Sequence, residues 1–214
     1  LLHPILPLSV SILFSIAISI YITGAFHEDG FADTCDGFGG GWTKEQILAI
    51  MKDSRIGTYG TVGILLILAI KFSILYEIGT FSLPLLVASY INSHITSRFV
   101  ASTLIQTHEY VQDIDKSKSR PITSTRLSFG EMIFGFLFVG IGWLLFAPHF
   151  IFSTAFISAH LSKMYLGHYF KKHIGGYTGD CLGATQQIGE VVFLTTVLTL
   201  CIFMERDIQL LIPG

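Results

Sequence analysis

The sequence has little charge, since only 13% of its 214 residues are Asp, Glu, Lys or Arg, whereas about a quarter is usual in a soluble domain. Its net charge of -2 offers no surplus of cations for a phosphate backbone, which argues against nucleic-acid binding. Its three cysteines have no C-x-x-C spacing, so neither a disulfide scaffold nor a structural zinc site is expected. Hydrophobic residues, in contrast, make up 51% of the chain, and the mean hydropathy is +0.63. This composition predicts a protein embedded in a lipid bilayer.

Long apolar runs recur along the chain, each long enough to cross most or all of a hydrocarbon layer of about 30 Å as a helix. Barrel strands would need only about ten residues, so helices are expected. No repeat or linker divides the chain. We therefore predict an all-α polytopic membrane bundle in which residues 1–214 form one transmembrane catalytic domain. The six predicted spans are residues 5–23, 59–76, 83–105, 127–147, 151–167 and 184–204.

Long polar loops alternate with short links between these spans. The long loops, residues 24–58, 106–126 and 168–183, carry nine of the thirteen Lys and Arg residues. The positive-inside rule therefore predicts that they face the cytoplasm from the cytoplasmic (inner) membrane. That orientation places Leu1 outside, which predicts one further span upstream of the visible chain.

The first long loop opens with an acidic run that follows His27. If the run is helical, Asp29, Asp33 and Asp36 fall at i, i+4 and i+7 on one face. Three like charges on one stripe repel, which predicts a compensating divalent cation, Mg²⁺, since this hard ion prefers oxygen ligands and also binds substrate phosphates. The alternative is a solvated acidic turn that begins a helix. The glycines at 39–41 offer backbone N–H groups to an anion.

A second motif precedes the second span. Lys52 and Arg55 are suited to neutralise phosphoryl oxygens, and Asp53 to complete a metal shell or orient one of them. An ordinary basic membrane anchor is the alternative. Residues 116–121 form another basic stretch, for which a solvated loop is favoured over a clamp for an anionic substrate.

A third motif leads into the last span. Gly179 and Asp180 suit either phosphate contact by free N–H groups or a second ligand to the metal, with Gln187 along the same helical stripe. The alternative is a loop with a helix N-cap.

Several ionisable residues lie at membrane depth. Glu190 and the pair His94 and Arg98 are functional candidates because charged groups are costly there, although Arg98 with an acidic partner fits a structural pair equally well. Lys71 and Lys163 are interpreted as snorkelling towards an interface.

Clustered carboxylates, nearby cations and Gly-rich loops are typical of phosphoryl transfer, which requires positioning and charge neutralisation. Three motifs occur in the same order as in a known family: residues 27–37, residues 51–57 with Gly60, and residues 178–184 with Glu190. On these motifs the chain resembles the adenosylcobinamide-GDP ribazoletransferase family, also called cobalamin synthase. Family members usually have a hydrophobic residue in place of Glu28 and often Ala in place of Cys35, and we interpret both positions as peripheral to the acidic stripe.

This resemblance implies a Mg²⁺-dependent transfer in the assembly of vitamin B12. A hydroxyl of α-ribazole, or of its 5′-phosphate, attacks the phosphorus on the cobinamide arm of adenosylcobinamide-GDP, and GMP leaves. The product is adenosylcobalamin or its 5′-phosphate. The hypotheses for metal binding are Asp29, Asp33 and Asp36, completed by Asp53 or Asp180. The catalytic candidates are His27, Asp33, Asp36, Lys52 and Arg55, with His27 or one of the aspartates as the base and Lys52 and Arg55 steadying GMP. The substrate-binding candidates are Asp53, Arg98, Gly179, Asp180, Gln187 and Glu190.

Three other functions compete with this one. A CDP-alcohol phosphotransferase is expected to have an Ala-Arg pair shortly after its Asp-Gly, whereas Asp36-Gly37 is followed here by Phe38 and glycines. A membrane prenyltransferase needs two separated DxxxD boxes, and here only Asp29 and Asp33 have that spacing. A divalent-cation transporter would carry acidic residues near the middle of several spans. The oligomeric state stays open.

Overall fold

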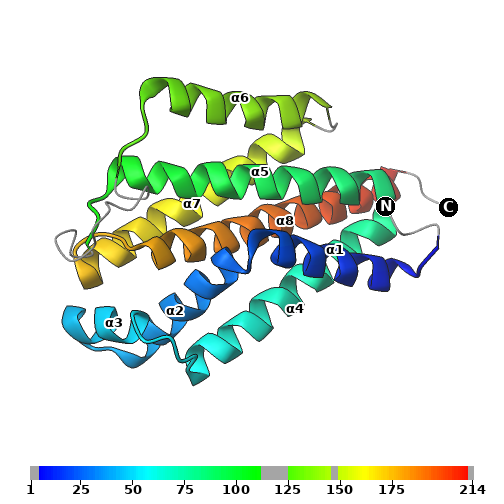
Figure 1. Cartoon of the computed structure of the whole chain (residues 1–214). Helices are drawn as coiled ribbons and strands as arrows, with labels where there is room; N and C mark the ends of the chain where they lie inside the picture. The colour runs from blue at the N-terminus through cyan, green and yellow to red at the C-terminus, as the bar shows by residue number, and fades with distance from the viewer. Residues whose placement is uncertain (1–4, 112–124, 146–148, 212–214) are drawn as a thin grey trace.

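The computed structural model describes residues 5–111, 125–145 and 149–211. Within these residues the chain forms helices, so the all-α prediction is confirmed. Figure 1 shows α8 running through the middle of the bundle, where it packs against α2, α4, α5 and α7, while α6 packs along α5 and α7. The helices are α1 (Leu8–Thr23), α2 (Phe26–Gly40), α3 (Lys44–Met51), α4 (Thr58–Phe81), α5 (Leu83–Thr107), α6 (Phe129–Leu145), α7 (His149–Ile174) and α8 (Gly179–Leu211).

Each predicted span coincides with a helix, although the ends differ by several residues. By length and apolar composition, α4 and the Gly179–Glu205 part of α8 qualify as membrane spans within the described residues. A third is added if α1 and α2, which meet at an angle of 88°, form one broken span. We treat α2 as lying outside the apolar layer, because four of its 15 residues are acidic. The number of six spans stays a prediction.

Two predicted loops are largely helical, which corrects the sequence-based boundaries. The stretch from residue 24 to 58 contains α2 and α3, and α7 and α8 leave only residues 175–178 between them. The sharp bend before α2 arises because Gly24 and Ala25 both adopt left-handed backbone angles, with φ of 63° and 56°. Ala25 has a Cβ atom, so its conformation costs about 1–2 kcal/mol. This bend turns the acidic helix away from α1 and towards α8.

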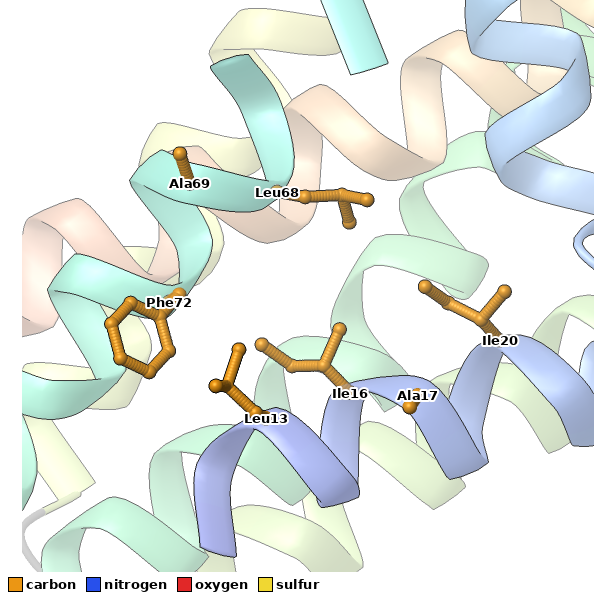
Figure 2. Close-up of a pocket in the computed structure, with 7 residues that line it drawn as sticks. All are labelled: Leu13, Ile16, Ala17, Ile20, Leu68, Ala69 and Phe72. Carbon is orange, nitrogen blue, oxygen red and sulfur yellow. The ribbon is translucent and has the colours of Figure 1, made fainter. Parts of the chain in front are cut away.

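Two apolar clusters hold the bundle together, one where α1, α4, α5, α7 and α8 meet and the other around α2, α3 and the start of α8. A groove of about 320 Å³ lies between α1 and α4. Figure 2 shows that its lining side chains are apolar: Leu13, Ile16, Ala17, Ile20, Leu68, Ala69 and Phe72. Since no lining side chain carries a charge or a hydrogen-bonding group, this groove is suited to lipid and not to phosphoryl chemistry.

Candidate active site

The acidic helix α2 crosses the start of α8 at two glycines, Gly30 and Gly183. A Cβ atom on Gly30 would lie 3.0 Å from Cα of Asp180, and one on Gly183 would lie 3.1 Å from the carbonyl oxygen of His27. Both distances are shorter than the ordinary van der Waals contacts of a Cβ atom, which begin at about 3.4 Å. The two backbones therefore approach closely only because both positions lack a side chain. The crossing brings the first and third sequence motifs together.

Carboxylates gather at this crossing. Because α2 is helical, Asp29 and Asp33 lie one turn apart, as the stripe requires. Neither carboxylate has a hydrogen-bond or ion-pair partner among the described residues. Burial, and then the negative charges of Asp180, Asp29 and Asp36, together raise the pKa of Asp33 to about 6. The repulsion expected from the sequence is therefore present, and it includes a carboxylate from α8.

Asp36 has a different role from its two neighbours on the stripe. One of its carboxylate oxygens accepts a hydrogen bond from the backbone N–H of Gly57 at 2.7 Å, and the other accepts one from Gly60 at 2.8 Å. It thus caps the N-terminus of α4, where free N–H groups and the helix dipole favour a negative charge. This cap joins the first and second motifs. Both carboxylate oxygens of Asp36 are occupied by hydrogen bonds from the backbone.

The second motif forms an exposed turn between α3 and α4. Arg55 binds Asp53 through its guanidinium, with Nη2 at 2.6 Å from Oδ2, and its backbone N–H also donates to Asp53. These hydrogen bonds lower the pKa of Asp53 to about 2. Asp53 therefore orients Arg55, one of the two roles expected for it. Lys52 ends α3 with an exposed side chain.

The two glycine-rich stretches differ in what they offer an anion. Residues 39–41 end α2, where carbonyl groups are free, so the expected anion contact at that position is wrong. Gly179 instead begins α8 and has open space where a Cβ would be. Thr178 caps the same helix, because its Oγ1 accepts from the N–H of Cys181 at 3.3 Å. The N-terminus of α8 is therefore the better position for a phosphate.

A pair of basic residues on α5, His94 and Arg98, lies within electrostatic reach of His27. The guanidinium of Arg98 donates to Nδ1 of His94 at 2.9 Å and to the His94 carbonyl at 3.1 Å. Arg98 forms no ion pair with a carboxylate among the described residues. The alternative that Arg98 forms a structural ion pair with an acidic residue is therefore wrong. Burial, and then the positive charge of Arg98, lower the pKa of the half-buried His27. The imidazole of His27 is therefore neutral at pH 7 and able to accept a proton.

Lys71 and Lys163 do not snorkel, which corrects the sequence interpretation. Both are buried, at 3% exposure. The ammonium of Lys71 lies 3.0 Å from Oε1 of Glu190, and Lys163 donates to Oγ1 of Thr107 at 3.1 Å. Partners inside the protein make burial possible, because an isolated lysine would have to reach water.

Gln187 and Glu190 are buried in a hydrogen-bonded network and not exposed towards a substrate. Oε1 of Gln187 accepts from Lys71 at 3.1 Å, while its Nε2 donates to Glu28 at 2.8 Å. Glu190 accepts from Gln186 at 2.8 Å. Both candidates therefore act through other side chains in this structure. Sequence reasoning missed Glu28 and Lys71. A signal was available for Lys71, because Lys71 and Glu190 are the single charged residues of two predicted spans.

The donor set suits Mg²⁺ bound together with a phosphate. Among the described residues, no three His, Cys, Asp or Glu side chains already converge as a complete cage. Mg²⁺ usually needs only one or two carboxylates and takes its other ligands from water and substrate phosphates. Asp29, Asp33 and Asp180 provide such carboxylates at the α2–α8 crossing, and their repulsion favours a cation there. Asp36 is less suited, because its oxygens are occupied.

The cobalamin-5-phosphate synthase family model matches residues 1–198. The chain belongs to the cobalamin-5-phosphate synthase family. Relatives named adenosylcobinamide-GDP ribazoletransferase come from Shewanella frigidimarina (45% identity over 91% of this chain and 74% of the relative), Shewanella piezotolerans (44%, 90% and 73%) and Shewanella amazonensis (37%, 92% and 75%). No solved structure matches the chain. The family membership confirms the resemblance drawn from the three motifs.

All three motifs of this cobalamin-5-phosphate synthase family member thus meet around α2. Asp36 connects α2 to the second motif, and the Gly30–Gly183 contact connects it to the third. The basic stretch at residues 116–121 lies outside the described residues, so its two interpretations stay open.

Proposed function

We propose that this chain joins α-ribazole, or its 5′-phosphate, to adenosylcobinamide-GDP in a Mg²⁺-dependent reaction that releases GMP. The product would be adenosylcobalamin or adenosylcobalamin 5′-phosphate. The observation that carries the proposal is the close glycine crossing of α2 and α8, which brings Asp29 and Asp33 within electrostatic reach of Asp180, in a chain whose named relatives are ribazoletransferases.

The metal would be held by Asp29, Asp33 and Asp180. When bound, Mg²⁺ would supply positive charge that neutralises the diphosphate of the activated corrinoid. Asp36 would contribute by holding the N-terminus of α4 against α2, so that the second motif stays beside the metal-binding carboxylates.

The reaction forms one P–O bond and breaks another. The ribazole hydroxyl oxygen attacks the phosphorus on the cobinamide arm, and the bond to GMP breaks with its electron pair remaining on the GMP phosphate. The proton of the attacking hydroxyl goes to a base. His27 suits this role because it is neutral at pH 7, and one of the aspartates is the alternative base.

Cations would bind the leaving group. Lys52 and Arg55 are exposed, and the hydrogen bonds from Arg55 to Asp53 fix the direction of its guanidinium. Phosphate oxygens of GMP would bind these two cations and the free N–H groups at the start of α8, near Gly179. Arg98 would hold a further anionic or hydrogen-bonding group of the substrate. We place these groups on the cytoplasmic side of the inner membrane, where the Lys and Arg residues of the long loops predict them.

The experiment uses the purified protein in liposomes. It is incubated with adenosylcobinamide-GDP, Mg²⁺ and either α-ribazole or α-ribazole 5′-phosphate, and the joined product and GMP are quantified by chromatography. Equal amounts of product and GMP are expected, with both lost when EDTA is added. The absence of product with either ribazole substrate at millimolar Mg²⁺ would overturn the proposal. Divalent-cation flux without turnover would favour the transporter instead.

A further inference from the structure

The contacts between α2 and α8 follow one antiparallel register. Glu28 contacts Gln187, Gly30 packs against Gly183, and Asp33 lies within electrostatic reach of Asp180. As residue numbers rise along α2 they fall along α8, which agrees with the opposite directions of the two helices in Figure 1. The crossing therefore has a hydrogen bond at one end, glycines in the middle and repelling carboxylates at the other end.

These two ends oppose each other energetically. Asp33 on α2 and Asp180 on α8 carry like charges within electrostatic reach of each other, so they push the helices apart. The Glu28–Gln187 hydrogen bond, at 2.8 Å, holds the helices together. It is the only side-chain hydrogen bond between α2 and α8 within the part of the chain that the structure describes. The glycines add close packing but no directional bond.

The partner of Glu28 is itself fixed. Gln187 is buried at 1% exposure, and its Oε1 accepts from the ammonium of Lys71, which is paired with Glu190. The amide of Gln187 is thereby oriented with Nε2 towards Glu28, because Oε1 must face the cation. Glu28, which directly precedes Asp29 in the sequence, is thus hydrogen-bonded to a side chain that the contacts between α4 and α8 hold in place.

We propose that Glu28 is a positioning residue that fixes α2 on α8 and so sets the spacing of Asp29, Asp33 and Asp180 for a divalent cation. Glu28 acts through its hydrogen bond to Gln187 and does not touch the metal. This inference rests on the proposed function for the identity of the metal site. It gives Glu28, interpreted from the sequence as peripheral to the acidic stripe, a role in holding that stripe against α8.

The test measures divalent-cation binding directly. Mn²⁺ is titrated as a probe into detergent-solubilised protein and followed by electron paramagnetic resonance, alongside the Mg²⁺ concentration for half-maximal turnover. We expect Glu28→Leu to raise the dissociation constant for Mn²⁺ and the Mg²⁺ concentration for half-maximal turnover, each about fivefold. A fivefold change corresponds to the loss of a hydrogen bond with a net contribution of about 1 kcal/mol. The turnover number at saturating Mg²⁺ should stay within about twofold, because the groups that contact substrate are unchanged.

Three further variants separate positioning from general stability. Glu28→Gln keeps the oxygen that accepts from Gln187 and should bind Mn²⁺ like the unmodified protein. Gln187→Leu should weaken Mn²⁺ binding as Glu28→Leu does, and the double variant should be no weaker than either single one. Glu45→Leu, which removes an exposed carboxylate from α3, is the control and should leave Mn²⁺ binding unchanged.

The outcomes are distinguishable. If Glu28→Leu lowers the thermal stability but leaves Mn²⁺ binding unchanged, Glu28 is structural only and the inference is wrong. If Glu28→Leu does not fold, Gln187→Leu decides, and unaltered Mn²⁺ binding by that variant overturns the inference. If the unmodified protein makes no cobalamin product but the variants weaken Mn²⁺ binding as expected, the proposed function fails and the positioning role stands.

Discussion

The glycine crossing of α2 and α8 leads to a prediction for the substitution Gly30→Ala. The new Cβ atom would lie 3.0 Å from Cα of Asp180 and 3.1 Å from its carbonyl oxygen. Carbon atoms pack best at about 3.5–4.0 Å, so the two helices would have to separate by roughly 0.5 Å or tilt. Both neighbours are backbone atoms, which cannot rotate away as the end of a flexible side chain does.

The size of the effect follows from this displacement. Overpacking in a well-packed region costs about 1–3 kcal/mol, partly offset by the better helix propensity of Ala, which is worth up to about 1 kcal/mol. Misplacement of reacting groups by about 1 Å lowers rates by about a hundredfold. We therefore expect Gly30→Ala to lower turnover by about tenfold or more, with a loss of about 1–2 kcal/mol in the free energy of unfolding.

The assay follows the formation of cobalamin product by purified protein in liposomes, with thermal unfolding measured in detergent. Gly189→Ala on α8 is the matched control, because its Cβ would lie at an ordinary contact distance of 3.8 Å from Cβ of Ser97. The control should keep its turnover and unfold at the same or a slightly higher temperature. Turnover by Gly30→Ala equal to that of Gly189→Ala would refute the importance of the close crossing.

Four further predictions concern charged side chains. Asp33→Asn should abolish transfer but not membrane insertion, and near-normal turnover would remove its metal-binding role. Asp36→Ala should lower the free energy of unfolding by about 1–2 kcal/mol through loss of the α4 cap, and an unchanged denaturation midpoint would contradict that role. Glu190→Gln should cost about 3–5 kcal/mol, because Lys71 stays buried without an anion; replacing both residues by Met should recover most of the loss, and equal stability of single and double variants would argue against the pair. In metal-free protein, the unfolding temperature should fall as the pH rises from about 4 to 7: the pKa of Asp33 is about 6 when folded against 3.8 in the reference state, so its ionisation favours unfolding. Mg²⁺ should reduce this fall, and an identical pH profile for Asp33→Asn would contradict it.

The helices were predictable from the sequence because apolar runs in a membrane protein allow few alternatives. The spacing of Asp29 and Asp33 also predicted their common face correctly. The helical form of α2 was left open, because its polar composition and six glycines between residues 24 and 41 are typical of a loop. Tertiary contacts stabilise the helical form of α2, since α2 packs extensively against α8.

The sequence predicted which residues form the candidate site, but not which residues they form hydrogen bonds and ion pairs with. That Asp36 caps α4 depends on the approach of Gly57 and Gly60, which lie more than twenty residues away in the chain. The burial of Lys71 likewise depends on Glu190, from a helix more than a hundred residues later. One sequence shows the cost of a buried charge but not which opposite charge compensates for it. The hydrogen bond of Glu28 likewise comes from Gln187, more than a hundred residues later in the chain.

Product formation by Asp180→Asn in liposomes tests the central claim most directly, because Asp180 is the carboxylate that α8 contributes to the crossing. With adenosylcobinamide-GDP, α-ribazole and Mg²⁺, the unmodified protein should form adenosylcobalamin and an equal amount of GMP. Asp180→Asn should reduce both products at least about a hundredfold while remaining folded in the membrane. A variant that makes cobalamin at the unmodified rate would contradict the account.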